Sequence, residues 1–235
     1  MAVNVRGVVF DKDGTLFDFN ATWGAWARGV IADEAQGDAE LAARLAGVLG
    51  YDTAAGAFRP GSIVIAETTA HVAQAILPLL PGADQAGLLD RLNRMSSNVP
   101  QVEAVPLAPF MAGLRAGGLA LGLVTNDAEM PARAHLARAQ VDTLFDFVAG
   151  YDSGHGAKPA PGPLLAFCAA TGLPPAACVM VGDSTHDLHA GRAAGMRTVG
   201  VLTGPATREV LEPVADAVLP SIAGLPALLA AWKAD

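Results

Sequence analysis

The sequence of 235 residues contains few charged residues, only two cysteines and no long uninterrupted apolar run. Charged residues make up 16% of the chain and apolar residues 52%, which excludes a disordered protein and is ample for a buried core. The apolar runs stop well short of the ~20 residues that a membrane-spanning helix requires. No charged-then-apolar leader precedes the first strand-like segment, so we expect a cytoplasmic protein.

Basic residues are also scarce, and the formal net charge is −8. Nucleic acids and anionic membranes attract basic surfaces, so we exclude both as partners. A phosphorylated substrate stays compatible with this charge, because a bound metal ion and one lysine can outweigh the overall field. The two cysteines, Cys168 and Cys178, lie in apolar segments without flanking basic groups. We therefore expect buried, reduced thiols and no catalytic cysteine.

Two aspartates one residue apart, Asp11 and Asp13, follow an apolar run at residues 8–10. Carboxylates this close repel unless protons or a cation hold them, and a divalent ion such as Mg2+ suits an all-oxygen site. Gly14 then allows the backbone to turn, and Thr15 adds a hydroxyl and an amide. The alternative is an ordinary surface turn, since Asp and Gly are common turn residues.

Polar groups also follow other segments further along the chain, and three of the polar sites stand at strand ends. In chain order they are Thr125, Asn126, Lys158, Asp183 and Asp187. The carboxyl ends of parallel strands share one edge of a sheet, where open α/β folds bind ligands. The combination therefore favours a metal-assisted phosphoryl-transfer site over a surface turn.

Strand-like runs alternate with helical segments along most of the chain, which predicts βαβ units and a mostly parallel sheet. Residues 19–98 break this rhythm, because they are alanine-rich and strand-poor. The helical stretches expected there are Trp23–Glu34, Ala39–Leu49, Ile63–Leu77 and Ala83–Met95. An insertion this long is not a crossover loop and predicts an all-helical cap over the catalytic edge.

The domain boundaries follow from this insertion. We expect residues 1–18 and 99–235 to form a catalytic core and residues 19–98 to form the cap domain. Between Asn126 and Lys158 there is room for about one helix and one strand. A second cap at that point is therefore excluded.

The motifs Asp-x-Asp-Gly-Thr, Thr-Asn, Lys-Pro and Gly-Asp-Ser-x-x-x-Asp resemble those of the haloacid dehalogenase (HAD) superfamily of hydrolases. Nearly the full length is similar to its phosphoglycolate phosphatase-like branch. The resemblance implies a Rossmann-like three-layer αβα core with a mostly parallel sheet, plus an inserted α-helical cap domain of the C1 type. It also implies a Mg2+-dependent phosphatase that hydrolyses a small phosphorylated metabolite through an aspartyl-phosphate. Phosphoglycolate is the first substrate candidate and a sugar phosphate the second.

The resemblance also assigns roles to the acidic residues. Asp11 would be the nucleophile, and Asp13 would protonate the leaving alcohol and then activate water. Asp11 and Asp183 would hold Mg2+ together with Asp13, which would contribute its main-chain carbonyl. Asp187 would bind the metal through water or orient Lys158.

The resemblance implies that the remaining site residues bind the phosphoryl group. Two of them, Thr125 and Lys158, would also be catalytic, together with Asp11 and Asp13. The phosphate-binding residues would be Gly14, Thr15, Thr125, Asn126 and Lys158. Arg59 is a further candidate, because an arginine can pair with a substrate carboxylate. A solvated surface arginine is the alternative for that residue.

Other members of the superfamily are less compatible with this chain. Dehalogenases lack the second aspartate, and phosphonate-cleaving members use a cap lysine, which residues 20–100 do not contain. A β-phosphoglucomutase-like sugar phosphomutase stays open, because it shares the metal set and the cap. From another class, a phospho-accepting receiver-type signalling domain is the alternative, although it needs neither the aspartate pair nor the cap. The chain is expected to be a monomer or a homodimer.

Overall fold

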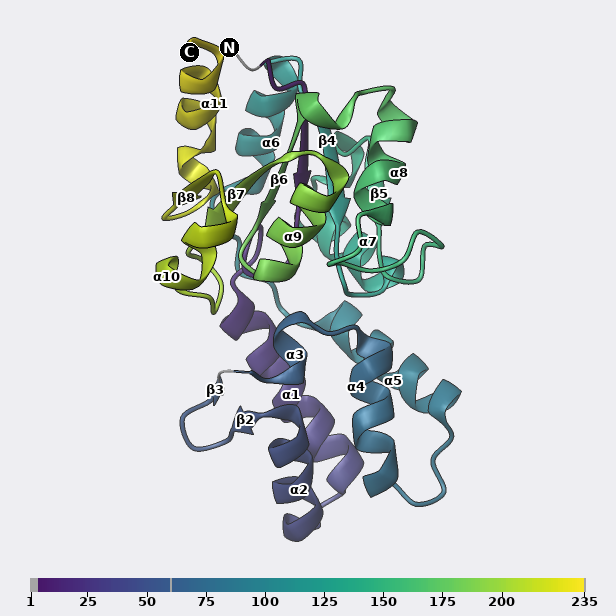
Figure 1. Ribbon diagram of the computed structural model, residues 1–235. Helices are drawn as coiled ribbons and strands as arrows, with labels where there is room; N and C mark the ends of the chain where they lie inside the picture. Colours follow the sequence, from purple (N-terminus) through teal and green to yellow (C-terminus); the bar gives the residue numbers. More distant parts are fainter. Residues whose placement is uncertain (1–3, 60, 235) are drawn as a thin grey trace.

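The computed structural model describes residues 4–59 and 61–234 and contains a six-stranded sheet (Figure 1). The strands, in chain order, are β1 (Gly7–Phe10), β4 (Ala120–Val124), β5 (Phe147–Ala149), β6 (Cys178–Gly182), β7 (Arg197–Val201) and β8 (Ala217–Leu219). They lie in the order β5-β4-β1-β6-β7-β8, and each neighbouring pair is parallel. The expected α/β core with a parallel sheet is confirmed.

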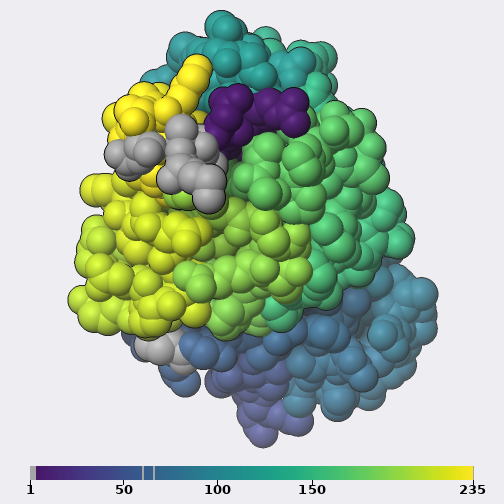
Figure 2. Space-filling model, turned by 45° about the horizontal axis from the view of Figure 1, so that its top comes forward, coloured from purple at the N-terminus to yellow at the C-terminus, as the bar shows by residue number. Residues whose placement is uncertain are grey.

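Helices cover both faces of this sheet, which explains why its strands are apolar almost throughout. The helices after the insertion are α6 (Leu107–Ala116), α7 (Glu129–Arg138), α8 (Gly162–Thr171), α9 (Thr185–Ala194), α10 (Arg208–Leu211) and α11 (Leu225–Ala234). Successive strand residues point to opposite faces. Val8 and Phe10 therefore pack with α6, α7 and α11, whereas Val9 packs with α8 and α9. The result is three layers. Figure 2 shows α11 (yellow) near the first described residues of the chain (purple), at the end of the core away from the insertion.

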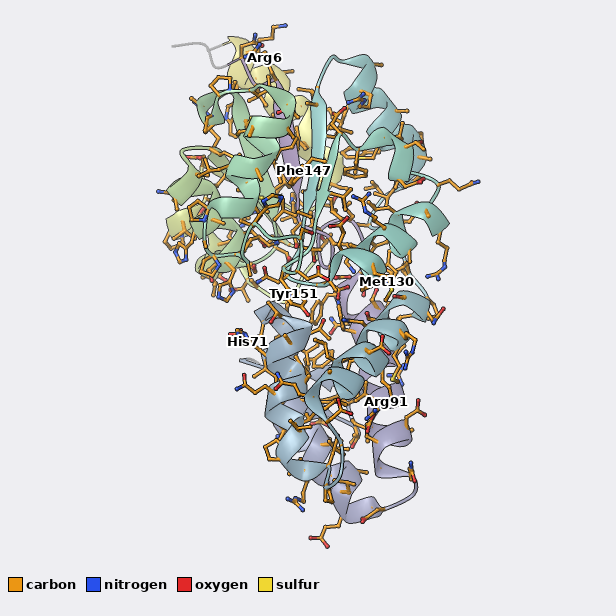
Figure 3. All side chains as sticks on the ribbon, turned by 90° about the vertical axis from the view of Figure 1, so that its right-hand side faces the viewer. Arg6, His71, Arg91, Met130, Phe147 and Tyr151 are labelled. Atoms are coloured by element: carbon orange, nitrogen blue, oxygen red, sulfur yellow. The ribbon has the colours of Figure 1, made fainter. Side chains whose placement is uncertain are left out.

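The inserted residues form a helical region with its own hydrophobic cluster, in which Trp26, Leu45 and Leu92 are buried. Its helices are α1 (Phe19–Ala35), α2 (Ala39–Leu49), α3 (Ile63–Ala66), α4 (Thr69–Ile76) and α5 (Gln85–Asn98). Figure 1 shows this region below the sheet edge at which β1 ends. Figure 3 shows Met130 and Tyr151 of the core where the two parts meet.

Two details of the helical region differ from the sequence prediction. It is not all-helical, because β2 (Tyr51–Asp52) and β3 (Ala57–Phe58) form an antiparallel hairpin. The expected helix over Ile63–Leu77 is also interrupted. Glu67 adopts an extended conformation (φ −81°, ψ 164°), and the Thr68 hydroxyl caps α4 by accepting a hydrogen bond from the His71 amide. A cap of this kind competes with helix continuation at that residue.

The two connections between the core and the helical region lie side by side. The Asp18 amide donates to the Val102 carbonyl, and the Ala104 amide donates to the Leu16 carbonyl, both at 2.8 Å.

No helix within residues 4–59 and 61–234 has the length and apolar character needed to cross a bilayer. Cys168 and Cys178 are free and buried as predicted, and burial raises the pKa of the Cys178 thiol to about 12.

Candidate active site

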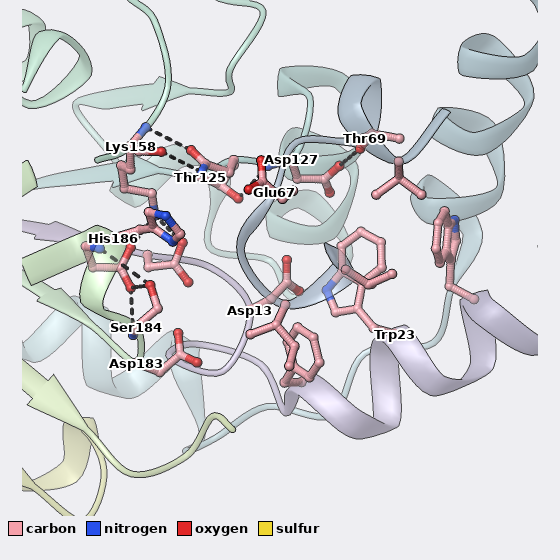
Figure 4. Close-up of a pocket in the computed structure, with 18 residues that line it drawn as sticks. Asp13, Trp23, Glu67, Thr69, Thr125, Asp127, Lys158, Asp183, Ser184 and His186 are labelled. Carbon is pink, nitrogen blue, oxygen red and sulfur yellow. Dashed lines mark hydrogen bonds and ion pairs between the residues drawn. The ribbon is translucent and has the colours of Figure 1, made fainter. Parts of the chain in front are cut away.

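The predicted polar residues gather at the carboxyl edge of three adjacent strands. Asp11 directly follows β1, Thr125 follows β4 and Asp183 follows β6, and β1 lies between the other two strands in the sheet. A cleft of about 560 Å³, part of it open to solvent, separates this edge from the helical region. Figure 4 shows Lys158, Ser184 and Asp183 on one side of the cleft, Trp23 and Thr69 on the other, and Asp13 between them.

Three buried carboxylates form the centre of the site. Asp11, Asp183 and Asp187 each offer an oxygen, and these oxygens lie within 4.8 Å of one another. The buried Lys158 ammonium donates to Asp11 Oδ1 at 2.5 Å and to Asp187 Oδ1 at 2.6 Å. The Ser184 amide and hydroxyl hold Asp187 Oδ2 at 3.0 and 2.7 Å, within the capping box of α9. One ammonium, paired with Asp11 and Asp187, thus shares the site with three carboxylates.

Burial and this charge imbalance shift the pKa values of the group. Burial, together with the charges of Asp187 and Asp13, raises the pKa of Asp11 to about 7 even though Lys158 opposes the shift. Burial and the charges of Asp11 and Asp187 raise the pKa of Asp183 well above its ordinary value. Burial alone would lower the pKa of Lys158, but Asp11 and Asp187 outweigh it and raise that pKa. The site lacks positive charge that a divalent cation could supply.

Asp13 stands apart from this carboxylate group. Its Oδ2 atom forms an ion pair with Lys12 at 2.9 Å, and its Oδ1 atom is buried without a hydrogen-bond partner among the described residues. Burial raises the pKa of Asp13, the charge of Lys12 lowers it and that of Asp127 raises it, and hydrogen-bonding contacts with Lys12 and the Trp23 side chain lower it. Because Asp13 lines the cleft, the unpartnered oxygen is available for a proton transfer there. The side chain is therefore not placed as a metal ligand.

Thr125 and Asn126 both line the cleft, but they are held differently. The buried Thr125 hydroxyl accepts from the Asp127 amide at 3.1 Å, which leaves its own hydrogen to donate. The Asn126 side chain clamps the main chain of Lys158, since its amide donates to the Lys158 carbonyl and its oxygen accepts from the Lys158 amide, both at 2.9 Å. Asn126 thus fixes the loop that carries Lys158, a role that the sequence did not indicate.

Gly14 and Thr15 lie beneath the site rather than along the lining of the cleft. Gly14 has φ +80°, and a Cβ atom there would lie 2.4 Å from Asp183 Oδ2, so a side chain would displace that carboxylate. The Thr203 hydroxyl donates to the Gly14 carbonyl at 2.6 Å, which ties the loop after β7 to the same turn. The Thr15 hydroxyl oxygen is buried without a hydrogen-bond partner among the described residues.

Arg59 does not reach the cleft in this structure. It follows the hairpin strand β3, is exposed, and donates its amide to the Gly50 carbonyl at 2.8 Å. The cleft wall on the helical side is instead mostly apolar. Its members are Phe19, Trp23, Trp26, Val64, Ile65, Glu67, Thr69 and Val72. The rings of Trp23 and Trp26 meet edge to face at 5.1 Å, and both residues belong to the hydrophobic cluster as predicted.

Sequence reasoning missed a second buried charge group behind Asp13. Lys12, the residue between the two aspartates, is fully buried, and its ammonium contacts Asp13, Asp127 and His135. One signal was present in the sequence, because a lysine directly after an apolar strand and between two acids must find partners if it is buried. The identity of those partners was not visible.

The parallel sheet with helices on both faces defines a Rossmann-like α/β protein, with a cluster of buried acids at the carboxyl edge of its strands. The family model for haloacid dehalogenase-like hydrolases matches residues 5–195, and the chain belongs to this family. A phosphoglycolate phosphatase of Salmonella typhimurium is 33% identical over 219 residues, which cover 86% of this chain and 82% of the relative.

Solved structures agree with this fold. A HAD phosphatase from Thermococcus onnurineus has a TM-score of 0.68 and 22% identity, over 96% of this chain and 98% of that one. A β-phosphoglucomutase from Clostridium difficile has a TM-score of 0.67 and 18% identity, over 98% of each chain. At these identities the likeness establishes the fold.

Proposed function

We propose that this protein is a Mg2+-dependent phosphatase that hydrolyses a small phosphorylated metabolite through an aspartyl-phosphate on Asp11. Membership of the hydrolase family and the similarity to phosphoglycolate phosphatases support hydrolysis of phosphoric monoesters. The observation that carries the proposal is the meeting of Asp11, Asp183 and Lys158 at one buried sheet edge.

The residues of this edge fit a hard divalent cation. Asp11, Asp183 and Asp187 supply oxygen donors only. Burial, and then repulsion between the carboxylates, raises the pKa values of Asp11 and Asp183, and a bound cation would favour their charged forms. Asp11 and Asp183 would hold the ion, and Asp187 would support it while orienting Lys158. When bound, Mg2+ would offset the negative charge of the phosphoryl group.

The chemistry would proceed in two displacements. An Asp11 oxygen forms a bond to phosphorus while the ester P–O bond breaks, and Asp13 gives a proton to the departing alcohol. Water then attacks the phosphorus, Asp13 takes its proton, and inorganic phosphate leaves as the Asp11 carboxylate is restored. Lys158 keeps Asp11 oriented throughout, and the Thr125 hydroxyl would hold a phosphoryl oxygen.

The helical region, proposed as a cap domain over residues 19–98, would bind the organic part of the substrate. Its wall is apolar apart from Glu67 and Thr69, and the Glu67 carboxylate would repel a carboxylate on the substrate. This wall favours an ester with an uncharged organic group, such as a sugar or polyol phosphate, over phosphoglycolate. The named activity of the Salmonella relative supports phosphoglycolate as the competing candidate.

Steady-state release of inorganic phosphate with and without Mg2+ tests the proposal. A phosphatase turns over p-nitrophenyl phosphate many times per molecule and stops when Mg2+ is chelated. Retention of one phosphoryl group per chain would instead identify the receiver-type alternative. Transfer of phosphate between sugar hydroxyls without release of inorganic phosphate would identify the phosphomutase. A cytoplasmic location and a monomeric or dimeric state stay predictions.

A further inference from the structure

Lys12 occupies a buried site in which three polar atoms surround its ammonium. Its Nζ atom lies 2.9 Å from each of three atoms, namely Asp13 Oδ2, Asp127 Oδ2 and His135 Nδ1. The side chain is fully buried, so these three atoms take the place of water around its ammonium: two accept hydrogen bonds, and Asp13 Oδ2 forms an ion pair. The position of Asp13 Oδ2 is therefore fixed by a group that does not itself line the cleft.

The histidine in this group acts as a neutral acceptor. His135 Nε2 lies 2.7 Å from the Ser96 carbonyl, which can only accept, so Nε2 carries the hydrogen and Nδ1 accepts from Lys12. Burial and the charge of Lys12 lower the pKa of His135 to about 3, which agrees with this form. The contact also joins the core helix α7 to α5 of the helical region.

Asp127 makes a second connection to the helical region. Its Oδ2 atom accepts from Lys12, and its Oδ1 atom accepts from the Thr69 hydroxyl of α4 at 3.3 Å. Asp127 and His135 thus each contact the helical region, Asp127 through α4 and His135 through α5. The Lys12 ammonium therefore connects Asp127 and His135, which contact the helical region, to Asp13.

We propose that Lys12 is a positioning residue that aims Asp13 Oδ1 at the leaving-group oxygen while α4 and α5 contact the core through Asp127 and His135. Lys12 occupies one oxygen of Asp13, and the other oxygen is buried without a hydrogen bond of regular geometry among the described residues, in a side chain that lines the cleft beside Trp23. The inference rests on the proposed function, in which Asp13 supplies the proton. It adds a residue and a contact between cap and core that the proposed function does not require.

The first-turnover rates of two esters test this role. An alkyl ester such as 2-hydroxyethyl phosphate needs a proton on its leaving oxygen, whereas p-nitrophenyl phosphate releases a stable phenolate. We expect Lys12→Met to slow alcohol release from the alkyl ester by roughly 100-fold, the lower end of a general-acid contribution. Release of p-nitrophenol in the first turnover should fall by less than about 5-fold, because proton donation hardly assists that step. Asp13→Asn should show the same selectivity.

A double variant separates positioning from a general loss of structure. If Lys12 acts through Asp13, the Lys12→Met/Asp13→Asn variant should be no slower on the alkyl ester than Asp13→Asn alone. Equal losses on both esters, or additive losses in the double variant, would overturn the proposal. Absence of turnover in the wild-type protein would instead refute the proposed phosphatase function.

Lys12→Met leaves Asp127 without its cation and can prevent folding, since breaking a buried ion pair costs about 3–5 kcal/mol. Thr69→Val provides the test in that case, because it keeps the size of the side chain and removes the hydroxyl that binds Asp127. Both esters are used at saturating concentration, since Thr69 also lines the cleft. In the first turnover, Thr69→Val should slow alcohol release from the alkyl ester about 5-fold more than it slows p-nitrophenol release. A factor of this size corresponds to less free energy than a hydrogen bond to a charged group contributes. Thr171→Val is the matched control, since it loses a hydroxyl bond to Phe167 in α8, away from the cleft. Identical rate ratios for the wild type, Thr69→Val and Thr171→Val would contradict the proposal.

Discussion

The two walls of the cleft differ in how they are built. The core wall consists of strand ends and carries buried charges, with Asp11, Asp183 and Asp187 around Lys158. The helical wall consists of side chains from α1, α3 and α4, with Trp23 and Val64 among its apolar members. Buried charges are stable only in one precise arrangement, whereas apolar walls accept several shapes. The difference indicates that the core wall sets the reaction and the helical wall selects the organic group.

The largest effect should come from the core wall, at the proposed nucleophile. Asp11→Asn should lower kcat by roughly 10³-fold or more, because the amide cannot attack phosphorus. The substitution also removes a negative charge from a crowded site, so Tm should be maintained or raised. Phosphate release and thermal unfolding of the same sample measure both effects. Substantial Mg2+-dependent activity in Asp11→Asn would assign the nucleophile to another residue.

Metal removal should change stability as well as activity. Chelation should stop turnover and lower the stability by about 2.7 kcal/mol if Mg2+ was present at 100 times its Kd. Urea unfolding with Mg2+ and with EDTA measures the difference. Asp183→Asn serves as the comparison, because the loss of one proposed ligand should shrink the Mg2+-induced gain. An equal gain in both proteins would place the ion elsewhere.

The metal-free protein should also show a pH dependence of known sign. Burial raises the folded-state pKa of Asp11 to about 7 from its ordinary value of 3.8. Folding therefore takes up a proton, and this contribution to stability is complete below pH ~4 and is lost as the pH rises toward 7. Urea midpoints in EDTA should fall between pH 5 and pH 7.5, and Asp11→Asn should flatten that fall. A wild-type midpoint that rises over this range would show that Asp11 is not protonated there.

A smaller effect is expected from the clamp behind the core wall. Asn126→Ala removes both side-chain hydrogen bonds to the Lys158 main chain. The two hydrogen bonds stabilise the position of Lys158 by about 1–2 kcal/mol, so their loss should lower kcat roughly 10-fold. Comparison with Asn98→Ala, which loses an exposed bond to the Arg94 carbonyl, controls for the loss of an amide group. Unchanged kcat in Asn126→Ala would show that the clamp is dispensable.

The smallest effect should come from the helical wall. Phosphoglycolate and 2-hydroxyethyl phosphate share a two-carbon skeleton and differ in a carboxylate against a hydroxymethyl group. Glu67 is exposed and its Oε2 atom lies 2.6 Å from His71 Nδ1, so its repulsion should favour the uncharged ester by only about 2- to 5-fold in kcat/KM. Glu67→Gln should reduce this preference, whereas Glu40→Gln on the exposed start of α2 should preserve it. A preference for phosphoglycolate that survives in the wild type would make that compound the better substrate assignment.

Local patterns in the sequence predicted the parallel sheet, the strands that end in polar residues of the site, and the position of the insertion. The strand ends were visible because apolar runs stop at Asp11, Thr125 and Asp183, and parallel topology brings such ends together. The hairpin of β2 and β3 was not visible, because strands of two residues have no detectable period.

Contacts between distant residues were the part that the sequence could not predict. Lys12 pairs with Asp127 and His135, which lie 115 and 123 residues further along the chain. The Asn126 clamp on Lys158 likewise depends on how two loops meet. Residue types indicate that a buried lysine needs acceptors, but only the packed structure identifies which ones. The same limit applies to Arg59, which a loop position made plausible and the structure leaves outside the cleft.

Rapid quenching of the wild-type protein with Mg2+ and a phosphomonoester, followed by mass spectrometry of its peptides, tests the central claim most directly. The proposed function predicts a transient phosphoryl group on Asp11, formed and lost at rates compatible with turnover. A phosphoryl group on any other residue, or turnover without a phosphorylated protein, would contradict it.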